Sequence, residues 1–383
     1  MNVLIVGAGM YVTGRGESGV GTILSSLIQT SKEQNISNIT IAAKSDNSGM
    51  VAEVARKINT RLKTKIEIQY VSLASIDLDE LCREGSFDFA IVSTPDQLHF
   101  RQIKTLLRNN IHVLSVKPLV STVKENRELV SLQKKHELLG VVEFHKRYDE
   151  ANLYTKKIIS KGLLGKVLYY DVNYSQKIKI PSETFKVWVE HTNIFQYLGV
   201  HYVDLFYFMT EFKPKKLMAF GTKGKLKSMA IDAYDSIHVS IVWQDSKGEE
   251  SITILNTSWV DPNCTSALSD QKYKIIGTEG RIENDHKNRG IEFVSNDSNI
   301  LHPNPYFSEY TLDANGDWQF CGYGFKSIRQ FVIDVASVLN GTHLAEEFES
   351  TRPTFSQALV STSIIEAVNK SLDNESRWEL VDA

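Results

Sequence analysis

The feature that most constrains how this chain can fold is a short apolar segment that leads directly into a glycine-rich turn. Residues 3–6 read Val-Leu-Ile-Val, and Gly7-Ala8-Gly9 follow without a break. An apolar, β-branched run of this kind is typical of a strand buried on both faces of a parallel sheet. Residues 23–32 then have a helical pattern. Strand, glycine turn and helix in this order can hold a dinucleotide pyrophosphate, because glycines allow close approach and the N–H groups of a helix start favour an anion.

The glycine turn departs from the usual dinucleotide pattern at its third glycine. In G-x-G-x-x-G that residue would be position 12, which is Val12, and the next glycines occur at 14, 16, 19 and 21. A loop inserted before the helix explains this spacing, and a glycine-rich turn without a ligand is the alternative. We expect Arg15 in the insertion to reach the pyrophosphate or the substrate. The residues of the turn expected to contact the cofactor are Gly7, Gly9, Met10 and Tyr11.

Strands and helices then alternate with short connections as far as residue 144. The pattern predicts strands at 39–43, 66–70, 87–92, 111–114 and 141–144, and helices at 51–62, 76–83, 98–108 and 123–136. This alternation predicts a parallel, doubly wound α/β sheet. Ligands of such sheets bind beyond the carboxyl ends of the strands. Four notable residues fall at such ends: Gly7, Lys44, Thr94 and Lys117.

The residues after the second strand bear on the choice of cofactor. Where a dinucleotide fold places an acidic residue on the adenosine ribose, this chain has Lys44 and Ser45, with Asp46 next. A cation and a hydroxyl suit a 2′-phosphate, so the sequence favours NADP. If Asp46 contacts the ribose instead, the cofactor is NAD.

Several motifs occur in an order that one known family shares. They are GAG at 7–9, STPDQLH at 93–99, KPL at 117–119, GVVEFHKRYD at 140–149, GLLGKV at 162–167, GVHYVDL at 199–205 and GTEG at 277–280. Together they resemble the Gfo/Idh/MocA oxidoreductases, named for glucose–fructose oxidoreductase and inositol dehydrogenase. The resemblance implies hydride exchange between NAD or NADP and a hydroxyl or keto carbon of a sugar or cyclitol. It also implies a cofactor site that extends to Thr94, Pro95, His99, Lys117 and Pro118.

The resemblance assigns catalytic roles to three residues. Lys117 corresponds to the lysine of the family's E-K-P motif, near the nicotinamide, where a desolvated ammonium stabilises developing alkoxide charge. Val116 replaces the glutamate of that motif. His201 corresponds to the general acid/base, and Tyr197 replaces the family's aspartate one helical turn earlier. The Tyr197 hydroxyl can face the substrate but cannot act as a carboxylate. From the residues alone, Lys117 could be a solvent-facing loop residue and His201 a core residue.

From about Thr122 the character of the chain changes, and after the helix 123–136 and the strand 141–144 complete the first domain, strands follow one another. We divide the chain into a dinucleotide-binding Rossmann domain at 1–145 and an α+β domain at 146–383. The predicted strands of the second domain are 167–174, 236–243, 250–257 and 272–276. Their succession predicts a large, mostly antiparallel open sheet. In the family such a sheet binds substrate and pairs subunits, so we expect a homodimer or homotetramer. Residues 296–324 are predicted to be a long loop, and the helix from Phe325 to pack on the first domain.

Two segments supply further candidates for substrate binding. Residues 145–148 read His-Lys-Arg-Tyr, which could hold an anionic sugar phosphate or nucleotide sugar, or could form a surface ion-pair cluster. Residues 185–193 combine hydrogen-bonding groups with a flat apolar ring, as carbohydrates require. The candidates in these segments are Arg147, Lys186, Trp188 and Asn193.

Composition excludes several classes of function. A net charge of −3 gives no electrostatic basis for binding nucleic acid or an acidic membrane. No apolar run approaches the roughly 20 residues of a membrane span, and the chain begins a strand at once, so we expect no signal peptide. The three cysteines and the histidines lack metal-ligand spacing, so we expect a cytoplasmic protein without a metal.

The sequence therefore predicts an NAD(P)-dependent oxidoreductase that acts on the CH–OH groups of a small carbohydrate or cyclitol. Two alternatives remain open. A tightly held cofactor could be recycled with no net redox change, or the chain could be a non-catalytic dinucleotide-binding regulator of the same fold.

Overall fold

The computed structural model describes residues 1–14, 20–296 and 299–382, so Arg15 lies outside the described residues. The chain forms two compact units. Unit 1 contains residues 1–120, 124–148 and 305–358, and unit 2 contains residues 121–123, 149–304 and the chain from 359 onward. The first unit is thus completed by a late part of the chain.

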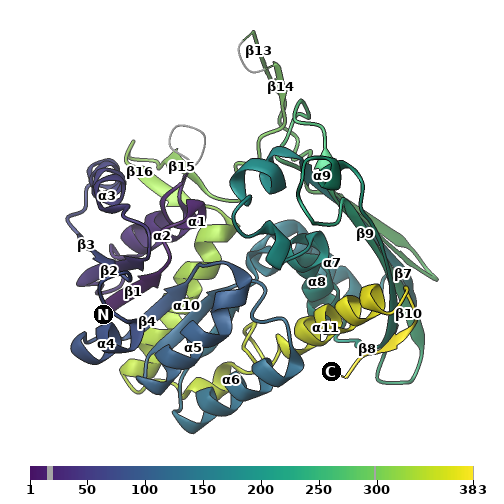
Figure 1. Cartoon of the computed structure of the whole chain (residues 1–383), viewed down its shortest axis with the longest axis horizontal. Helices are drawn as coiled ribbons and strands as arrows, with labels where there is room; N and C mark the ends of the chain where they lie inside the picture. The colour runs from purple at the N-terminus through teal and green to yellow at the C-terminus, as the bar shows by residue number, and fades with distance from the viewer. Residues whose placement is uncertain (15–19, 297–298, 383) are drawn as a thin grey trace. The chain divides into compact units, whose positions relative to one another are not determined.

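Unit 1 is built on a six-stranded parallel sheet with the order β3-β2-β1-β4-β5-β6 (Figure 1). Its strands are β1 (Asn2–Val6), β2 (Asn38–Ala43), β3 (Glu67–Ser72), β4 (Phe89–Val92), β5 (His112–Val116) and β6 (Gly140–Glu143). The intervening helices are α1 (Met10–Thr13), α2 (Thr22–Thr30), α3 (Ser48–Leu62), α4 (Leu78–Glu84), α5 (His99–Arg108) and α6 (Val123–Lys135). Short 3-10 turns are η2 (Asp96–Leu98) and η3 (His145–Tyr148). This arrangement confirms the predicted doubly wound α/β sheet.

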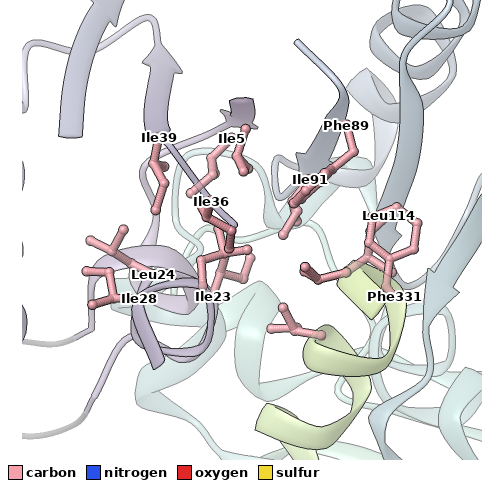
Figure 2. Packing of buried hydrophobic residues seen from close by; sticks show 14 of the residues in the cluster. Ile5, Ile23, Leu24, Ile28, Ile36, Ile39, Phe89, Ile91, Leu114 and Phe331 are labelled. Carbon is pink, nitrogen blue, oxygen red and sulfur yellow. The ribbon is translucent and has the colours of Figure 1, made fainter. Parts of the chain in front are cut away.

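The core of unit 1 explains why these strands read as continuous apolar runs. β1 is central in the sheet, and residues 3–6 are wholly buried. Ile5, Ile39 and Ile91 of the strands belong to the same buried cluster as Ile23 of α2 (Figure 2). The helix α10 (Tyr323–Leu339) completes this core, and its Phe331 ring packs edge-on against Phe89 at a centroid distance of 5.6 Å.

Unit 2 contains a seven-stranded sheet with the order β12-β11-β7-β10-β9-β8-β17. Its strands are β7 (Val167–Lys177), β8 (Lys213–Thr222), β9 (Ser236–Gln244), β10 (Glu250–Asp261), β11 (Ser269–Gly277), β12 (Arg281–Asp285) and β17 (Glu379–Leu380). Strand β10 pairs in parallel with β7, and the other pairs are antiparallel. The predicted mostly antiparallel sheet is therefore confirmed.

Helices accompany this sheet in unit 2. They are α7 (Glu150–Ser160), α8 (Val200–Thr210), α9 (Lys225–Ser228) and α11 (Leu359–Asp373). Figure 1 shows α7, α8 and α11 close together, and α8 contacts both of the others. Among the described residues, no helix is both long and apolar enough to span a membrane.

One prediction about secondary structure is wrong, and one long strand was missed. The segment 296–324 is not one long loop, because it contains β14 (Asn299–Leu301), which pairs with β13 (Phe293–Ser295), and the hairpin of β15 (Glu309–Leu312) and β16 (Trp318–Cys321). These strands are three or four residues long, too short to show an alternation. Strand β8 was not predicted, since three lysines and a proline in its first half mask its buried Leu217 and Ala219.

Candidate functional site

The glycine turn after β1 is held against the end of the neighbouring strand β4. Gly7 has φ +110°, and a Cβ built there would lie 2.2 Å from the backbone oxygen of Ser93. The Gly7 N–H donates to Ala42 of β2 at 2.8 Å, and Ser93 N–H donates to Val6 at 2.8 Å. Position 7 therefore requires glycine for both its conformation and its space.

The insertion after Gly9 contains the short helix α1, and Gly14 forms a bridge with Val20. A Cβ on Gly21 would lie 2.3 Å from the backbone oxygen of Val12. Gly21 thus permits close packing where α2 begins, while Val12 is fully buried. Gly9 is different, because it is exposed and a Cβ there would meet nothing within 4 Å. The turn therefore has an open edge at Gly9, beside Met10 and Tyr11 of α1.

Lys44, Ser45 and Asp46 follow the carboxyl end of β2, and all three are exposed. The Asp46 carboxylate accepts hydrogen bonds from the Ser48 hydroxyl at 2.8 Å and the Ser48 N–H at 3.2 Å. These bonds lower the pKa of Asp46. The Tyr70 hydroxyl donates to the Ser45 carbonyl. Asp46 is therefore engaged by the start of α3, whereas the Lys44 ammonium lies at the surface.

His99 joins the turns that follow β4 and β5. Its ring is completely buried, with Nε2 2.8 Å from the Thr94 carbonyl oxygen and Nδ1 2.8 Å from the Pro118 carbonyl oxygen. The Thr94 hydroxyl donates to Gln102 of α5 at 2.6 Å. Pro95 is half-buried between these positions. His99 thus fixes the backbone of two candidate cofactor-binding turns rather than presenting its own ring at the surface.

Lys117 comes directly after β5, at the carboxyl edge of the parallel sheet, and is half-buried. Removal of the ammonium from water lowers the pKa of Lys117 to about 8, although the charges of Asp96 and Glu143 oppose that shift. An amine that titrates near 8 can exchange a proton close to neutral pH. Lys117 therefore has the placement and the protonation behaviour of a group that acts in acid–base chemistry.

A buried carboxylate near Lys117 was missed by sequence reasoning. Glu143 ends β6, is 3% exposed, and accepts a hydrogen bond from the Tyr11 hydroxyl at 3.0 Å. The same oxygen, Oε2, lies 2.9 Å from Nδ1 of His145. The other oxygen, Oε1, accepts a hydrogen bond from the Ser327 hydroxyl of α10. The rings that surround the cluster are Tyr11, His145, Phe307 and Tyr323. The one available signal was a glutamate inside the otherwise apolar segment 141–144.

His201 and Tyr197 belong to unit 2, on two consecutive helical segments. His201 lies in the first turn of α8 and is 4% exposed. Tyr197 lies in η6 (Phe195–Gly199), a π-helical segment that runs directly into α8. The predicted α-helical turn between the two residues is therefore a wider π-helical one, a feature often found at functional sites.

Aromatic rings gather around Tyr197. Its ring lies 4.8 Å from Phe185, 6.2 Å from Trp188 and 6.1 Å from Trp259, between centroids. Trp259 of β10 is fully buried, and its Nε1 donates to Gln176 of β7 at 3.2 Å. Trp259 was not identified from the sequence. It lies more than 60 residues after Tyr197 in the chain, so the sequence gives no sign that the two rings are in contact. Trp188 and Tyr197 remain half-buried, so they can still contact a ligand.

The other predicted substrate residues have varied surroundings. Lys186 is exposed. Asn193 donates to Asn369 of α11 at 2.9 Å and accepts from the Gln196 N–H at 2.9 Å, so its amide stabilises the start of η6. Arg147 is 6% exposed, and its guanidinium donates to Gln357 at 2.7 Å. A surface ion-pair cluster at 145–148 is therefore wrong for Arg147, which is buried.

The candidate residues thus form two sets. Unit 1 contains the glycine turn, Lys44, Ser45, Thr94, Pro95, His99, Lys117, Pro118 and Arg147, and unit 2 contains Lys186, Trp188, Asn193, Tyr197 and His201. Within the described part of the chain, no group of three or more His, Cys, Asp or Glu side chains could hold a metal ion.

Comparison with known proteins gives a consistent result. Residues 1–144 match a family model described as the oxidoreductase family with an NAD-binding Rossmann fold, and residues 153–283 match the GFO/IDH/MocA C-terminal domain. An uncharacterised oxidoreductase of Schizosaccharomyces pombe is 24% identical over 322 residues, 77% of this chain and 81% of that protein. A scyllo-inositol 2-dehydrogenase (NADP(+)) of Bacillus subtilis is 29% identical over 100 residues, 26% of this chain and 28% of that protein.

Solved structures share the fold. The crystal structure of scyllo-inositol dehydrogenase from Lactobacillus casei, with bound NAD(H) and scyllo-inositol, has a TM-score of 0.71 and 15% sequence identity. The match covers 100% of this chain and 99% of that chain. Both the parallel sheet and the large mixed sheet thus have a counterpart in a known enzyme.

Proposed function

Since the chain belongs to the Gfo/Idh/MocA family of NAD-binding oxidoreductases, we propose that it transfers a hydride between a nicotinamide dinucleotide and the carbinol or keto carbon of a polyhydroxylated substrate, a cyclitol or a sugar derivative. The observation that carries the proposal is Lys117, a lysine with a pKa lowered to about 8 at the carboxyl edge of a dinucleotide-binding sheet.

The glycine turn fits a dinucleotide. Gly7 brings the chain against Ser93 so closely that a Cβ could not be accommodated, and Gly9 leaves an open backbone edge. A pyrophosphate at this edge could accept hydrogen bonds from backbone N–H groups at the start of α1, and Gly9 has no side chain that would block its approach. The bound nicotinamide would supply or accept the hydride.

Lys117 would bind the reacting oxygen of the substrate. In its ammonium form it donates a hydrogen bond to that oxygen and stabilises the alkoxide that develops as the carbinol loses its hydride. With a pKa of about 8, Lys117 keeps this proton at neutral pH but can also release it. His99 supports this role indirectly, because it holds the Pro118 carbonyl next to Lys117 in a fixed position.

His201 would take the hydroxyl proton during oxidation and return it during reduction. Tyr197 would contribute its hydroxyl and its ring to substrate binding. The rings of Trp188 and Tyr197, whose planes are inclined by 61°, would each offer an apolar surface to the C–H groups of a cyclitol or sugar. Lys186 is exposed on the same segment and would bind a peripheral hydroxyl or an anionic substituent.

Residues at the adenosine end support NADP as the preferred cofactor. Lys44 and Ser45 are exposed after β2. One oxygen of the Asp46 carboxylate already accepts two hydrogen bonds from Ser48, which holds this side chain at the start of α3. A 2′-phosphate would therefore meet a cation and a hydroxyl at this place.

The large sheet of unit 2 supports assembly into a homo-oligomer. On one face of β7 and β10, Tyr169 is opposite Ile252 in register, and both are more than one-third exposed together with Ile254. A row of apolar side chains on a sheet face is typical of a protein–protein contact. We propose that a second copy of the chain covers it.

The substitution Lys117→Met tests the proposed function. It removes the ammonium and keeps the length of the side chain, so we expect turnover to fall by at least about 100-fold, since one preorganised donor contributes roughly 2.7–4 kcal/mol. Dinucleotide affinity should change less than about threefold. In the wild-type enzyme, ketone reduction should decline above pH 8 as Lys117 loses its proton.

The measurement is the change in nicotinamide absorbance with a panel of cyclitols, sugars and sugar phosphates, together with cofactor titration by fluorescence. Lys124→Met, on α6, is the matched control and should leave turnover unchanged. Full turnover by Lys117→Met would contradict the assignment of Lys117. Product formation without any net change in nicotinamide absorbance would instead indicate that the cofactor is recycled.

A further inference from the structure

We propose that Glu143 is a positioning residue for Lys117, and that it supplies from the neighbouring strand the carboxylate that position 116 lacks. The proposal rests on the proposed role of Lys117 in catalysis. It concerns a residue that lies within the motif GVVEFHKRYD but has no role assigned from the sequence. It follows from the register of two parallel strands.

The register places Glu143 directly beside the residue that precedes Lys117. Strands β5 and β6 are parallel, and Val116 is the partner of Glu143. Neighbouring strands lie about 4.8 Å apart, and register partners in a parallel pair point to the same side of the sheet. A carboxylate at position 143 therefore occupies the same local region as a carboxylate at position 116 would. Compared with the family's motif, the negative charge is located on the neighbouring strand, one strand spacing away.

The hydrogen bonds of Glu143 show that its orientation is fixed. The Tyr11 hydroxyl donates to one carboxylate oxygen at 3.0 Å, and the Ser327 hydroxyl donates to the other. His145 also lies within 2.9 Å of the carboxylate. These partners come from α1, α10 and η3, three elements that surround the carboxyl end of β6. A carboxylate that is 3% exposed and accepts hydrogen bonds at both oxygens is held in one orientation.

The effect of Glu143 on Lys117 is electrostatic. Burial favours the neutral amine of Lys117, whereas the negative charge of Glu143 favours the ammonium. Asp96 of η2 acts in the same direction. Tyr11 and His145 contact Glu143 directly, and His99 contacts the Pro118 carbonyl next to Lys117. The surrounding elements also carry other titratable side chains, which are Lys146, Arg147 and Tyr148 of η3 and Tyr323, Lys326, Arg329 and Asp334 of α10. Without the charge of Glu143, a larger fraction of Lys117 would be the neutral amine. The neutral amine carries no positive charge with which to stabilise an alkoxide.

The substitution Glu143→Gln tests this inference, because it keeps the size of the side chain and removes its charge. We expect the pH at which ketone reduction declines to move to lower pH by about one unit, equivalent to a tenfold change in the ratio of ammonium to amine. Activity at low pH should return close to the wild-type rate. Glu67→Gln, an exposed glutamate on β3, is the control and should leave the profile unchanged.

A double variant makes the test specific to charge. In Val116→Glu/Glu143→Gln the carboxylate moves to the register partner, and we expect the decline to return toward its wild-type pH. NMR titration of the lysine side-chain amines, with Lys117→Met to assign the signal, measures the Lys117 pKa directly without any substrate. A fall of that pKa in Glu143→Gln would support the inference even if the proposed reaction were wrong. An unchanged Lys117 pKa in Glu143→Gln, or a loss of rate that is equal at all pH values, would overturn it.

Discussion

The two glycines at the start of the turn allow a paired prediction, because one is closely packed and the other is open. At Gly7 a Cβ would lie 2.2 Å from the Ser93 oxygen, and φ is +110°. A non-glycine residue in such a conformation costs about 1–3 kcal/mol, and the backbone shift that relieves the contact costs about 1–3 kcal/mol more. We therefore expect Gly7→Ala to lower the free energy of unfolding by roughly 2–6 kcal/mol, a large share of the stability of a typical domain.

Gly9→Ala is the matched partner and should behave in the opposite way. Gly9 has φ −74° and ψ −177°, which any residue adopts, and its Cβ would meet nothing within 4 Å. An alanine there should therefore be neutral or add about 0.4–1 kcal/mol of stability. The added methyl would nevertheless stand where a pyrophosphate approaches the backbone, so we expect dinucleotide affinity to fall at least about tenfold, or 1.4 kcal/mol.

Urea denaturation followed by circular dichroism measures the first effect, and fluorescence titration with NADH and NADPH measures the second. If Gly7→Ala had the same free energy of unfolding as the wild-type protein, the packing argument would be refuted. Unchanged dinucleotide affinity in Gly9→Ala would refute the placement of the pyrophosphate at this edge.

Two further predictions concern the cofactor-binding edge of the sheet. Lys44→Ala should weaken NADPH binding at least about tenfold, because loss of a charged contact to a 2′-phosphate costs about 1.5–3 kcal/mol, and should leave NADH binding within about twofold. Equal effects on the two cofactors in fluorescence titrations would contradict a 2′-phosphate contact. His99→Ala should lower the free energy of unfolding by about 2–4 kcal/mol, because it opens a cavity and leaves the Thr94 and Pro118 carbonyls without their imidazole partner. Urea denaturation tests this, and His343→Ala, at an exposed histidine, is the control.

The fold of unit 1 could be predicted because each strand carries its own signal. A parallel strand buried on both faces is a continuous apolar run, as in residues 3–6 and 89–92, and short connections fix the order of the elements. Strand β8 was missed for the opposite reason. One of its faces is covered and the other is solvated, and the lysines of the solvated face dominate its sequence. The hairpin of β15 and β16 depends on contacts with residues far away in the chain, such as the bond from the Tyr310 hydroxyl to Ser25.

From the residues alone, the position of a candidate residue in the fold could be predicted only at the ends of strands. Gly7, Thr94 and Lys117 could be found because the carboxyl ends of parallel strands lie at one edge. The π-helical turn between Tyr197 and His201 could not, because no residue type encodes it and its cost is met by tertiary packing.

The carboxylate beside Lys117 shows why a missing motif residue is weak evidence for a missing function. Read along the chain, Val116 leaves Lys117 without its acidic neighbour, which favours an inactive relative. Across the sheet, the register partner of Val116 is Glu143, and its charge acts on Lys117. Electrostatic interactions depend on distance and burial, not on sequence adjacency. A substitution at one strand end can therefore be compensated from the next strand, and the compensating residue becomes visible only when the register is known.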